Sequence, residues 1–208
     1  MAVKEVELST IEEVLTTLTT AEFNDALKRN RSAFLFRGLP NVSYKLTTSL
    51  RWNCKGKAGE LEPSILRNFS KYAASTSPLN SCWEQMVIGQ HHGLPTRLMD
   101  WTYSPLAALH FATSGEDITG MNQHDAVVWA IDITEMNTLL PAKYQKVLND
   151  ERAYLFTIDM LDRVAKDLTT YDNDMGEDGI VLLEPPSIDQ RIINQYSYFS
   201  IIPSGVED

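Results

Sequence analysis

The sequence predicts an α+β fold, a single domain in which helices flank a mixed or antiparallel β-sheet. Short apolar runs rich in β-branched or aromatic residues recur at 33–36, 126–133, 180–183 and 198–202, and segments with helical spacing separate them. The 208 residues are 43% hydrophobic, which is enough to build one full core. Because no repeat or low-complexity tract interrupts the pattern, we expect one compact unit.

Helices are expected wherever apolar residues recur at three-and-four spacing. Ser9 to Glu12 has the pattern of a capping box, and Ser187 with Gln190 has the same spacing near the C-terminal end. The run at 126–133 should be a central strand. The expected helices cover residues 11–18, 23–27, 61–72, 83–91, 105–112, 134–139 and 159–168. The glycine-rich segment 55–63 is expected to be a mobile connection, and the acidic segment 171–179 a surface loop.

Charge and cysteine content exclude several classes of protein. The net charge of −10 argues against a broad basic surface for duplex nucleic acid. The two cysteines have no metal-ligand spacing, so neither a disulfide framework nor a metal site is expected. The sequence shows no apolar run of membrane-spanning length and no signal-peptide h-region, so we expect a cytoplasmic, unexported chain without a membrane partner.

Ionisable and polar residues are concentrated between two apolar helical segments, from Glu84 to Ala112. This concentration makes the stretch the best candidate for a functional site, although on residue types alone a structural pair or buried network at Arg97 and Asp100 is the commoner outcome. The polar residues of the stretch are Glu84, Gln90, His91, His92, Thr96, Arg97, Asp100, Trp101, Thr102 and His110.

The two helical segments of this stretch have clear boundaries. Gly93 and Pro95 should end the first helix, on which Glu84 and His91 share a face and could cooperate. Ser104 should cap the second helix, with a proline at its first position. Because that second helix is apolar on almost every side, we expect it to be buried and His110 to be a core histidine.

Other arginines could contact an anion. Arg37 ends a buried strand, and the adjacent Gly38 would allow a ligand to approach the backbone closely. Arg51 is a second candidate, with a structural role as the alternative. Arg191 and Gln195 are four residues apart, on one side of a helical turn. The chain lacks a glycine-rich phosphate loop, a G-x-S-x-G elbow and an H-E-x-x-H zinc helix, and Cys82 reads as a buried thiol.

The stretch resembles the signature of the FRG domain family, whose core is a Gln-His-aromatic-Gly-Leu-Pro-Thr-Arg-Leu-Leu-Asp-Trp-Thr pattern followed by a small apolar helix. Here the core runs from Gln90 to Thr102, with His92 where the family more often has Tyr. The triplet Phe36-Arg37-Gly38 gives the family its name. The resemblance covers roughly residues 30 to 202 and implies an N-terminal helical segment at 1–29 packed on an FRG domain at 30–208. It also implies a bacterial or phage setting: antiphage defence, counter-defence or a toxin.

A more distant resemblance is to ADP-ribosyltransferases, which implies a fold like theirs and NAD as cofactor. In those enzymes a first strand ends in Arg, as at Arg37, and a later strand and helix end in Ala-x-x-Phe-Ala, as at Ala108 to Ala112. Their last strand carries a catalytic Glu. The corresponding block here has Arg191 and Gln195 but no Glu, so Glu84 or Asp100 would have to substitute.

Two function classes remain open. The first is an enzyme handling NAD or a related nucleotide, with Glu84, His91 and Asp100 as catalytic groups. The second is a non-catalytic FRG module that binds a nucleotide, a nucleic-acid end or a protein partner. In both, Arg37, Arg97 and Asp100 should form the polar centre. The expected ligand contacts are Arg37, Gly38, Arg51, Gln90, Thr96, Arg97, Trp101, Thr102, Arg191 and Gln195.

Overall fold

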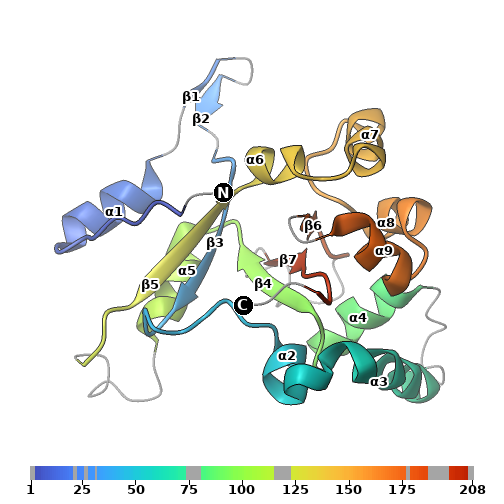
Figure 1. Ribbon diagram of the computed structural model, residues 1–208. Helices are drawn as coiled ribbons and strands as arrows, with labels where there is room; N and C mark the ends of the chain where they lie inside the picture. The colour runs from blue at the N-terminus through green and yellow to red at the C-terminus, as the bar shows by residue number, and fades with distance from the viewer. Residues whose placement is uncertain are drawn as a thin grey trace.

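The computed structural model describes residues 3–20, 23–25, 28–30, 32–73, 81–114, 123–176, 179–186 and 197–205. Within these residues the main sheet has five antiparallel strands in the order β5-β3-β4-β7-β6, with helices around it (Figure 1). The α+β fold is therefore confirmed, and the sheet is wholly antiparallel. The strands are β3 (Phe34–Leu39), β4 (Leu98–Thr102), β5 (Val127–Asp132), β6 (Val181–Leu183) and β7 (Ser197–Ile201).

Helices form most of the remaining described chain. Ser104 caps a helix that begins with a proline, as predicted. The capping box expected from Ser9 to Glu12 lies one residue further on, between Thr10 and Glu13. The helices are α1 (Ile11–Thr19), α2 (Ser49–Cys54), the 3-10 turn η1 (Lys55–Lys57), α3 (Ala58–Ala73), α4 (Cys82–His91), α5 (Pro105–Thr113), α6 (Ile133–Thr138), α7 (Ala142–Glu151), α8 (Ile158–Val164) and α9 (Leu168–Met175).

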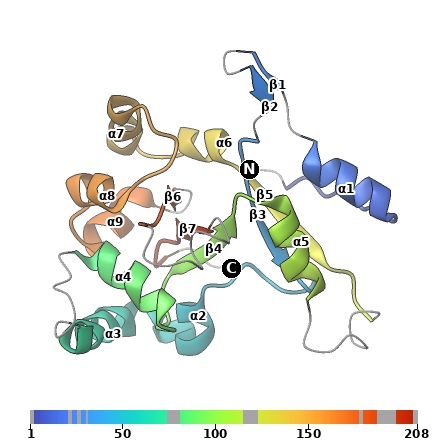
Figure 2. The same cartoon turned by 180° about the vertical axis from the view of Figure 1, so that it is seen from behind.

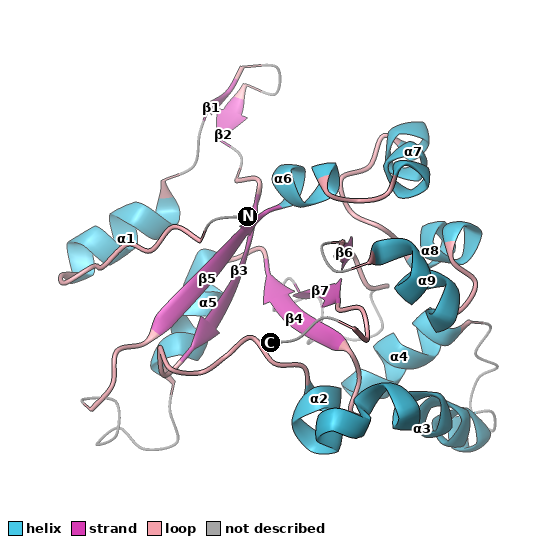
Figure 3. Cartoon of the chain, in the orientation of Figure 1, coloured by secondary structure: helices cyan, strands magenta, loops and turns pink. Residues whose placement is uncertain are grey.

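The sheet divides between β3 and β4. All six residues of β3 pair with β5, whereas only Phe36 of β3 pairs with β4, opposite Thr102. Figure 3 shows β3 and β5 side by side, with β4 leaving β3 at an angle. Arg37 comes directly after the single shared pair, so this arginine lies where the two strands diverge.

The hydrophobic core has two clusters because strand side chains alternate between faces. On β4, Leu98 joins the larger cluster, and Met99 and Trp101 join the smaller one. On β6, Val181 and Leu183 join the larger cluster, while the residue between them joins the smaller. Helices α4, α7, α8 and α9 supply most of the remaining larger cluster.

Two expectations about strands are wrong. The run at β5 is an edge strand rather than a central one. Its apolar composition reflects packing on the two faces of the strand, which does not require a neighbouring strand on each side. The expected helix at 23–27 is replaced by a two-stranded ribbon, in which β1 (Phe23–Asn24) pairs with β2 (Arg29–Asn30). Residues 26 and 27 lie outside the described residues.

Two segments expected to be loops are helical. Residues 55–63 form η1 and the start of α3, with Pro63 inside the helix. The acidic segment begins within α9, where Tyr171 is fully buried. In both cases a long-range contact outweighs local propensity, because Glu62 of α3 and Asp172 of α9 bind the same buried arginine, Arg97. The expected helix at 159–168 is two helices, α8 and α9.

Helix α5 is less buried than its composition predicted. Only Ala108 and Ala112 are buried, while Leu106 and Phe111 are 50% and 45% exposed. His110 is exposed as well, so the prediction of a core histidine is wrong. An apolar composition all round a helix does not determine which side faces the sheet. In α5 the side with small residues faces the sheet, because small residues allow close packing on β3.

Candidate functional site

The three residues of the Phe36-Arg37-Gly38 triplet lie in different surroundings. Phe36 is buried and pairs with β4. A Cβ at Gly38 would lie 2.7 Å from the amide nitrogen of Ala112 and still closer to the carbonyl oxygen of Ala108. Glycine at this position therefore allows the backbone of α5 to pack directly on β3. The structure gives Gly38 a packing role, and its predicted ligand contact remains a prediction.

Arg37 reaches across the divergence between β3 and β4. Its Nη1 donates to the backbone carbonyl of Asp100 at 2.7 Å, and the Asp100 carboxylate lies 3.9 Å away. The side chain is 24% exposed, yet its Nε is buried and has no hydrogen-bond acceptor among the described residues. Burial lowers the pKa of the Arg37 guanidinium, and the charge of Asp100 opposes that shift. Such a cation is incompletely partnered, which favours a further acceptor.

A short chain of hydrogen bonds orients Asp100 from the turn before β4. Gln90 Nε2 donates to Asp100 Oδ1 at 3.0 Å, and Thr96 Oγ1 donates to Gln90 Oε1. Thr96 Oγ1 also accepts from the Leu98 amide at 3.1 Å. The Asp100 side chain is 61% exposed. Gln90, Thr96 and Asp100 thus form one connected group beside Arg37. Their ligand contacts remain predictions.

Arg97 belongs to a different network. Its Nε donates to both carboxylate oxygens of Glu62, at 2.8 and 2.9 Å, and its Nη1 binds Asp172. Arg97 and Glu62 are buried. Burial alone would lower the pKa of Arg97, but the hydrogen bonds and charge of Glu62, followed by those of Asp172, raise it. The predicted grouping of Arg97 with Arg37 and Asp100 is not formed, because Arg97 and Asp100 are three residues apart and point to opposite sides of an extended chain.

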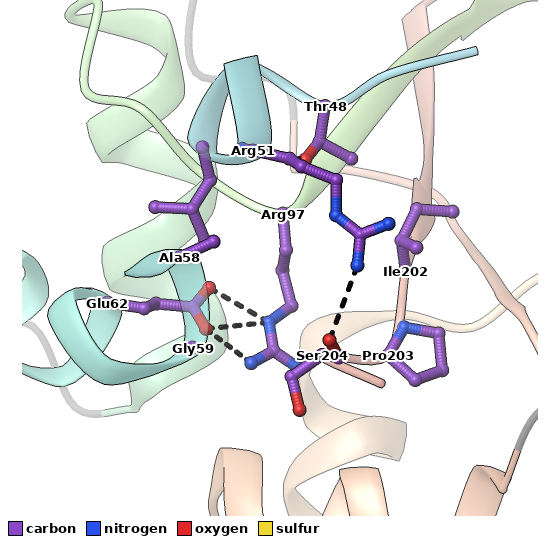
Figure 4. Close-up of a pocket in the computed structure, with 10 residues that line it drawn as sticks. Thr48, Arg51, Ala58, Gly59, Glu62, Arg97, Ile202, Pro203 and Ser204 are labelled. Atoms are coloured by element: carbon purple, nitrogen blue, oxygen red, sulfur yellow. Dashed lines mark hydrogen bonds and ion pairs between the residues drawn. The ribbon is translucent and has the colours of Figure 1, made fainter. Parts of the chain in front are cut away.

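Arg51 lines a small pocket next to that network. In Figure 4 its guanidinium points toward Ser204, whose carbonyl accepts a hydrogen bond from Nη2 at 3.4 Å. The pocket volume is about 20 Å³, room for little more than one water molecule. The predicted anion contact of Arg51 remains a prediction. The pocket is lined by Thr48, Leu50, Arg51, Ala58, Gly59, Glu62, Arg97, Ile202, Pro203 and Ser204.

The other predicted site residues lie apart from one another. Glu84 is in the first turn of α4, beside α8, where it adds to the effect of burial in raising the pKa of Asp162. His91 ends the same helix, and seven residues of helical rise separate the two by about 10 Å along the axis. Their predicted cooperation remains a prediction.

Trp101 and Thr102 are buried structural residues. The Trp101 ring packs in the smaller core cluster, and its Nε1 donates to Ser200 Oγ at 2.9 Å. Thr102 Oγ1 accepts from the Ser104 amide at 3.1 Å, which helps to set the start of α5. Arg191 and Gln195 lie outside the described residues. Trp101 is 5% exposed, and its predicted ligand contact remains a prediction.

Sequence reasoning missed three residues with defined roles. Glu62 and Asp172 both bind Arg97. A sequence signal exists for Glu62, which lies four residues before the buried Leu66 and therefore on the same face of the helix. Trp129 is the residue paired with Arg37 across β3 and β5, and its Nε1 is also buried without an acceptor among the described residues. Nothing in the local sequence indicates that pairing.

The described residues contain no group of three or more His, Cys, Asp or Glu side chains placed to hold a metal ion. In the same part of the chain, no helix is long and apolar enough to cross a membrane.

Cys82 is expected to alkylate slowly in the folded protein. Burial, followed by the charges of Asp162 and Asp167, raises the pKa of its thiol to about 12, from 9.0 without these effects. The thiolate fraction at pH 8 then falls by about 1000-fold, and the higher nucleophilicity of a more basic thiolate recovers only part of this. Iodoacetamide should modify Cys82 at least roughly 30-fold more slowly in the native state than in urea, as measured by peptide mass spectrometry. Equal rates would show an accessible, ionised thiol.

Comparison with known proteins finds one family match. Residues 32–119 match the family model of the FRG domain, a range that begins before β3 and ends after α5. The matched range includes both Arg37 and Asp100. No curated protein matches the chain. No solved structure matches it either.

Proposed function

We propose that the FRG domain binds a phosphate-bearing nucleotide where β3 and β4 diverge, with NAD as the candidate ligand, and that it acts on this ligand as an ADP-ribosyltransferase-like enzyme. The observation that carries the proposal is the buried Nε of Arg37, which has no acceptor among the described residues. A phosphate oxygen supplies both an acceptor and a negative charge.

The surroundings of Arg37 favour an anion over a neutral ligand. Its nearest partners are one backbone carbonyl and a carboxylate oxygen 3.9 Å away, so its charge is only partly compensated. A guanidinium offers five donors in a plane, and one carbonyl occupies only part of that set. Because the chain has a net charge of −10, the ligand is held by a local cation rather than by a broad basic surface.

Asp100 is the acidic group best placed for chemistry beside Arg37. In ADP-ribosyl transfer the bond between nicotinamide and ribose C1′ breaks, and nicotinamide leaves with the electron pair. An acceptor atom attacks C1′ and loses its proton. A carboxylate stabilises the positive charge that develops on the ribose. The Asp100 side chain is 61% exposed and held by Gln90, so it is accessible to such a substrate.

A second candidate is a non-catalytic FRG module that binds the same ligand, a nucleic-acid end or a protein. The observation in its favour is the contact of Arg37 with Asp100, which is sufficient to recognise a ligand without an acid–base step. Incubation with NAD distinguishes the two: release of nicotinamide supports the enzyme, and binding without release supports the module. A role in antiphage defence, counter-defence or toxicity belongs to this proposal and is tested by expression in infected and uninfected bacteria.

The affinity for NAD is expected to depend on Arg37. Replacing Arg37 with Ala removes a charge-assisted contact worth about 1.5–3 kcal/mol, or roughly 10 to 150-fold in Kd. Isothermal titration calorimetry with NAD, ADP-ribose and ATP measures the change.

Arg163→Ala is the matched control for that experiment. It removes the same charge from an exposed pair with Glu151, where the side chains are 55% and 43% exposed. Affinity should be unchanged in this variant. Equal affinity in wild type and Arg37→Ala would contradict the phosphate assignment and leave the Phe36-Arg37-Gly38 triplet a folding feature.

A further inference from the structure

Two buried donors without acceptors occur on residues that face each other directly. Arg37 on β3 pairs with Trp129 on β5, and within the described residues neither Arg37 Nε nor Trp129 Nε1 has a hydrogen-bond partner. Directly opposed residues on neighbouring strands place their Cβ atoms about 4.5–5.5 Å apart, on the same face of the sheet. The two side chains that carry these donors therefore start side by side on one face of the sheet.

The face that carries this pair is the one opposite α5. Along β3, Phe36 and Gly38 alternate with Leu35 and Arg37, and Gly38 packs under α5. Figure 2 shows α5 in front of β3 and β5, so the face of Arg37 is the far one in that view. Leu35 lies in the smaller core cluster, and Trp129 packs against it. The Trp129 ring is thus fixed by apolar packing, while its N–H remains unused.

The unpartnered N–H of Trp129 distinguishes its indole from the buried indoles of Trp83 and Trp101. Trp83 Nε1 donates to the Ala165 carbonyl at 2.8 Å, and Trp101 Nε1 donates to Ser200 Oγ at 2.9 Å. A buried N–H is normally paired because an unpaired donor destabilises the folded state. A ligand oxygen that meets both orphaned donors would remove that cost.

We propose that Arg37 Nε and Trp129 Nε1 together bind the diphosphate group of the ligand. The proposal rests on the nucleotide-binding function proposed above and deepens it, because it names a nucleoside diphosphate moiety as the recognised part. One indole N–H and one guanidinium N–H on paired residues offer two donors to the acceptor oxygens of adjacent phosphoryl groups. A neutral ligand with a single acceptor would leave one of the two donors unpaired.

Replacing Trp129 with Phe tests the proposal, because Phe keeps an aromatic ring and has no N–H donor. We expect the Kd for inorganic pyrophosphate and for NAD to rise about 10-fold or more, the effect of losing one hydrogen bond to a charged group. The melting temperature of the free protein should fall by less than in Trp83→Phe, since the change removes ring volume but no hydrogen bond. Calorimetry and thermal unfolding of the full chain give both readouts.

Trp83→Phe is the matched control, because it removes an indole N–H that has a partner. Its melting temperature should fall by a few degrees while the Kd for pyrophosphate is unchanged. If Trp129→Phe lowers the melting temperature as Trp83→Phe does, its N–H has a partner in the free protein and the proposal is overturned.

Failure of this inference and failure of the proposed function give different results. If Arg37→Ala weakens NAD binding and Trp129→Phe does not, the nucleotide site stands and the paired-donor inference is overturned. If wild type binds pyrophosphate in a Trp129-dependent way but does not bind NAD, the paired donors stand and the nucleotide function fails. If wild type binds neither probe, both are overturned.

Discussion

Replacing Glu62 with Ala is expected to lower the free energy of unfolding by about 3–5 kcal/mol, the largest effect that the structure predicts. Glu62 and Arg97 are 1% and 4% exposed, and the Arg97 guanidinium donates to both oxygens of the Glu62 carboxylate. Without Glu62, a buried cation keeps only Asp172 as its partner. Chemical denaturation monitored by circular dichroism measures the loss.

An exposed ion pair provides the control for this prediction. Glu151→Ala breaks the pair with Arg163, which is worth about 1 kcal/mol or less because water screens it. The double change of Glu62 to Leu and Arg97 to Met should recover much of the stability lost in Glu62→Ala, since no unpaired charge remains buried. A loss in Glu62→Ala as small as that in Glu151→Ala would show that the Arg97 network does not hold the fold together.

Gly38→Ala is expected to destabilise the protein by about 3 kcal/mol or more. The added methyl would lie 2.7 Å from the amide nitrogen of Ala112 and closer still to the carbonyl oxygen of Ala108. Both are backbone atoms of α5, so no side chain can rotate away, and the helix itself would have to move off β3. Because Gly38 is next to Arg37 on β3, a displacement of β3 from α5 should lower the affinity for any ligand at Arg37 as well as the stability.

Gly56→Ala tests whether the effect at position 38 is specific to its contact. No atom lies within 4 Å of a Cβ built at Gly56. Alanine there should change stability by about 1 kcal/mol at most, in the stabilising direction, because it restricts the unfolded chain. If Gly38→Ala and Gly56→Ala melt at the same temperature, α5 does not pack on β3 as closely as the structure indicates.

Local pattern predicted the strands and several helix boundaries well. The apolar runs at β3, β5, β6 and β7 are strands, and Ser104 with Pro105 starts α5. These features depend on neighbouring residues in the chain. The order of the strands in the sheet does not depend on neighbouring residues in the chain. For that reason β5 was predicted to be central, although it lies at the edge.

Contacts between distant segments explain what the sequence could not predict. Residues 55–63 have the composition of a loop, yet they enter a helix whose Glu62 is held by Arg97, 35 residues further on. The acidic segment is likewise fixed by Asp172, which is 75 residues from Arg97. Glycine, proline and carboxylate content cannot reveal a partner so far away in the chain.

The candidate site was predicted in part. The neighbouring positions of Arg37 and Asp100 followed from motif residues at strand ends, and the structure places them in contact. The predicted grouping of Arg97 with Arg37 and Asp100 was wrong. Arg97 is three residues from Asp100, and side chains three residues apart on an extended chain point to opposite faces. Trp129 was missed because its pairing with Arg37 depends on the register between β3 and β5.

A crystal structure of the protein soaked with ADP-ribose tests the central claim most directly. The account predicts density for the diphosphate on the face of β3 and β5 opposite α5, with a phosphate oxygen about 2.7–3.2 Å from Arg37 Nε. Density for the ligand in the pocket beside Arg51, with Arg37 Nε still unpartnered, would contradict it.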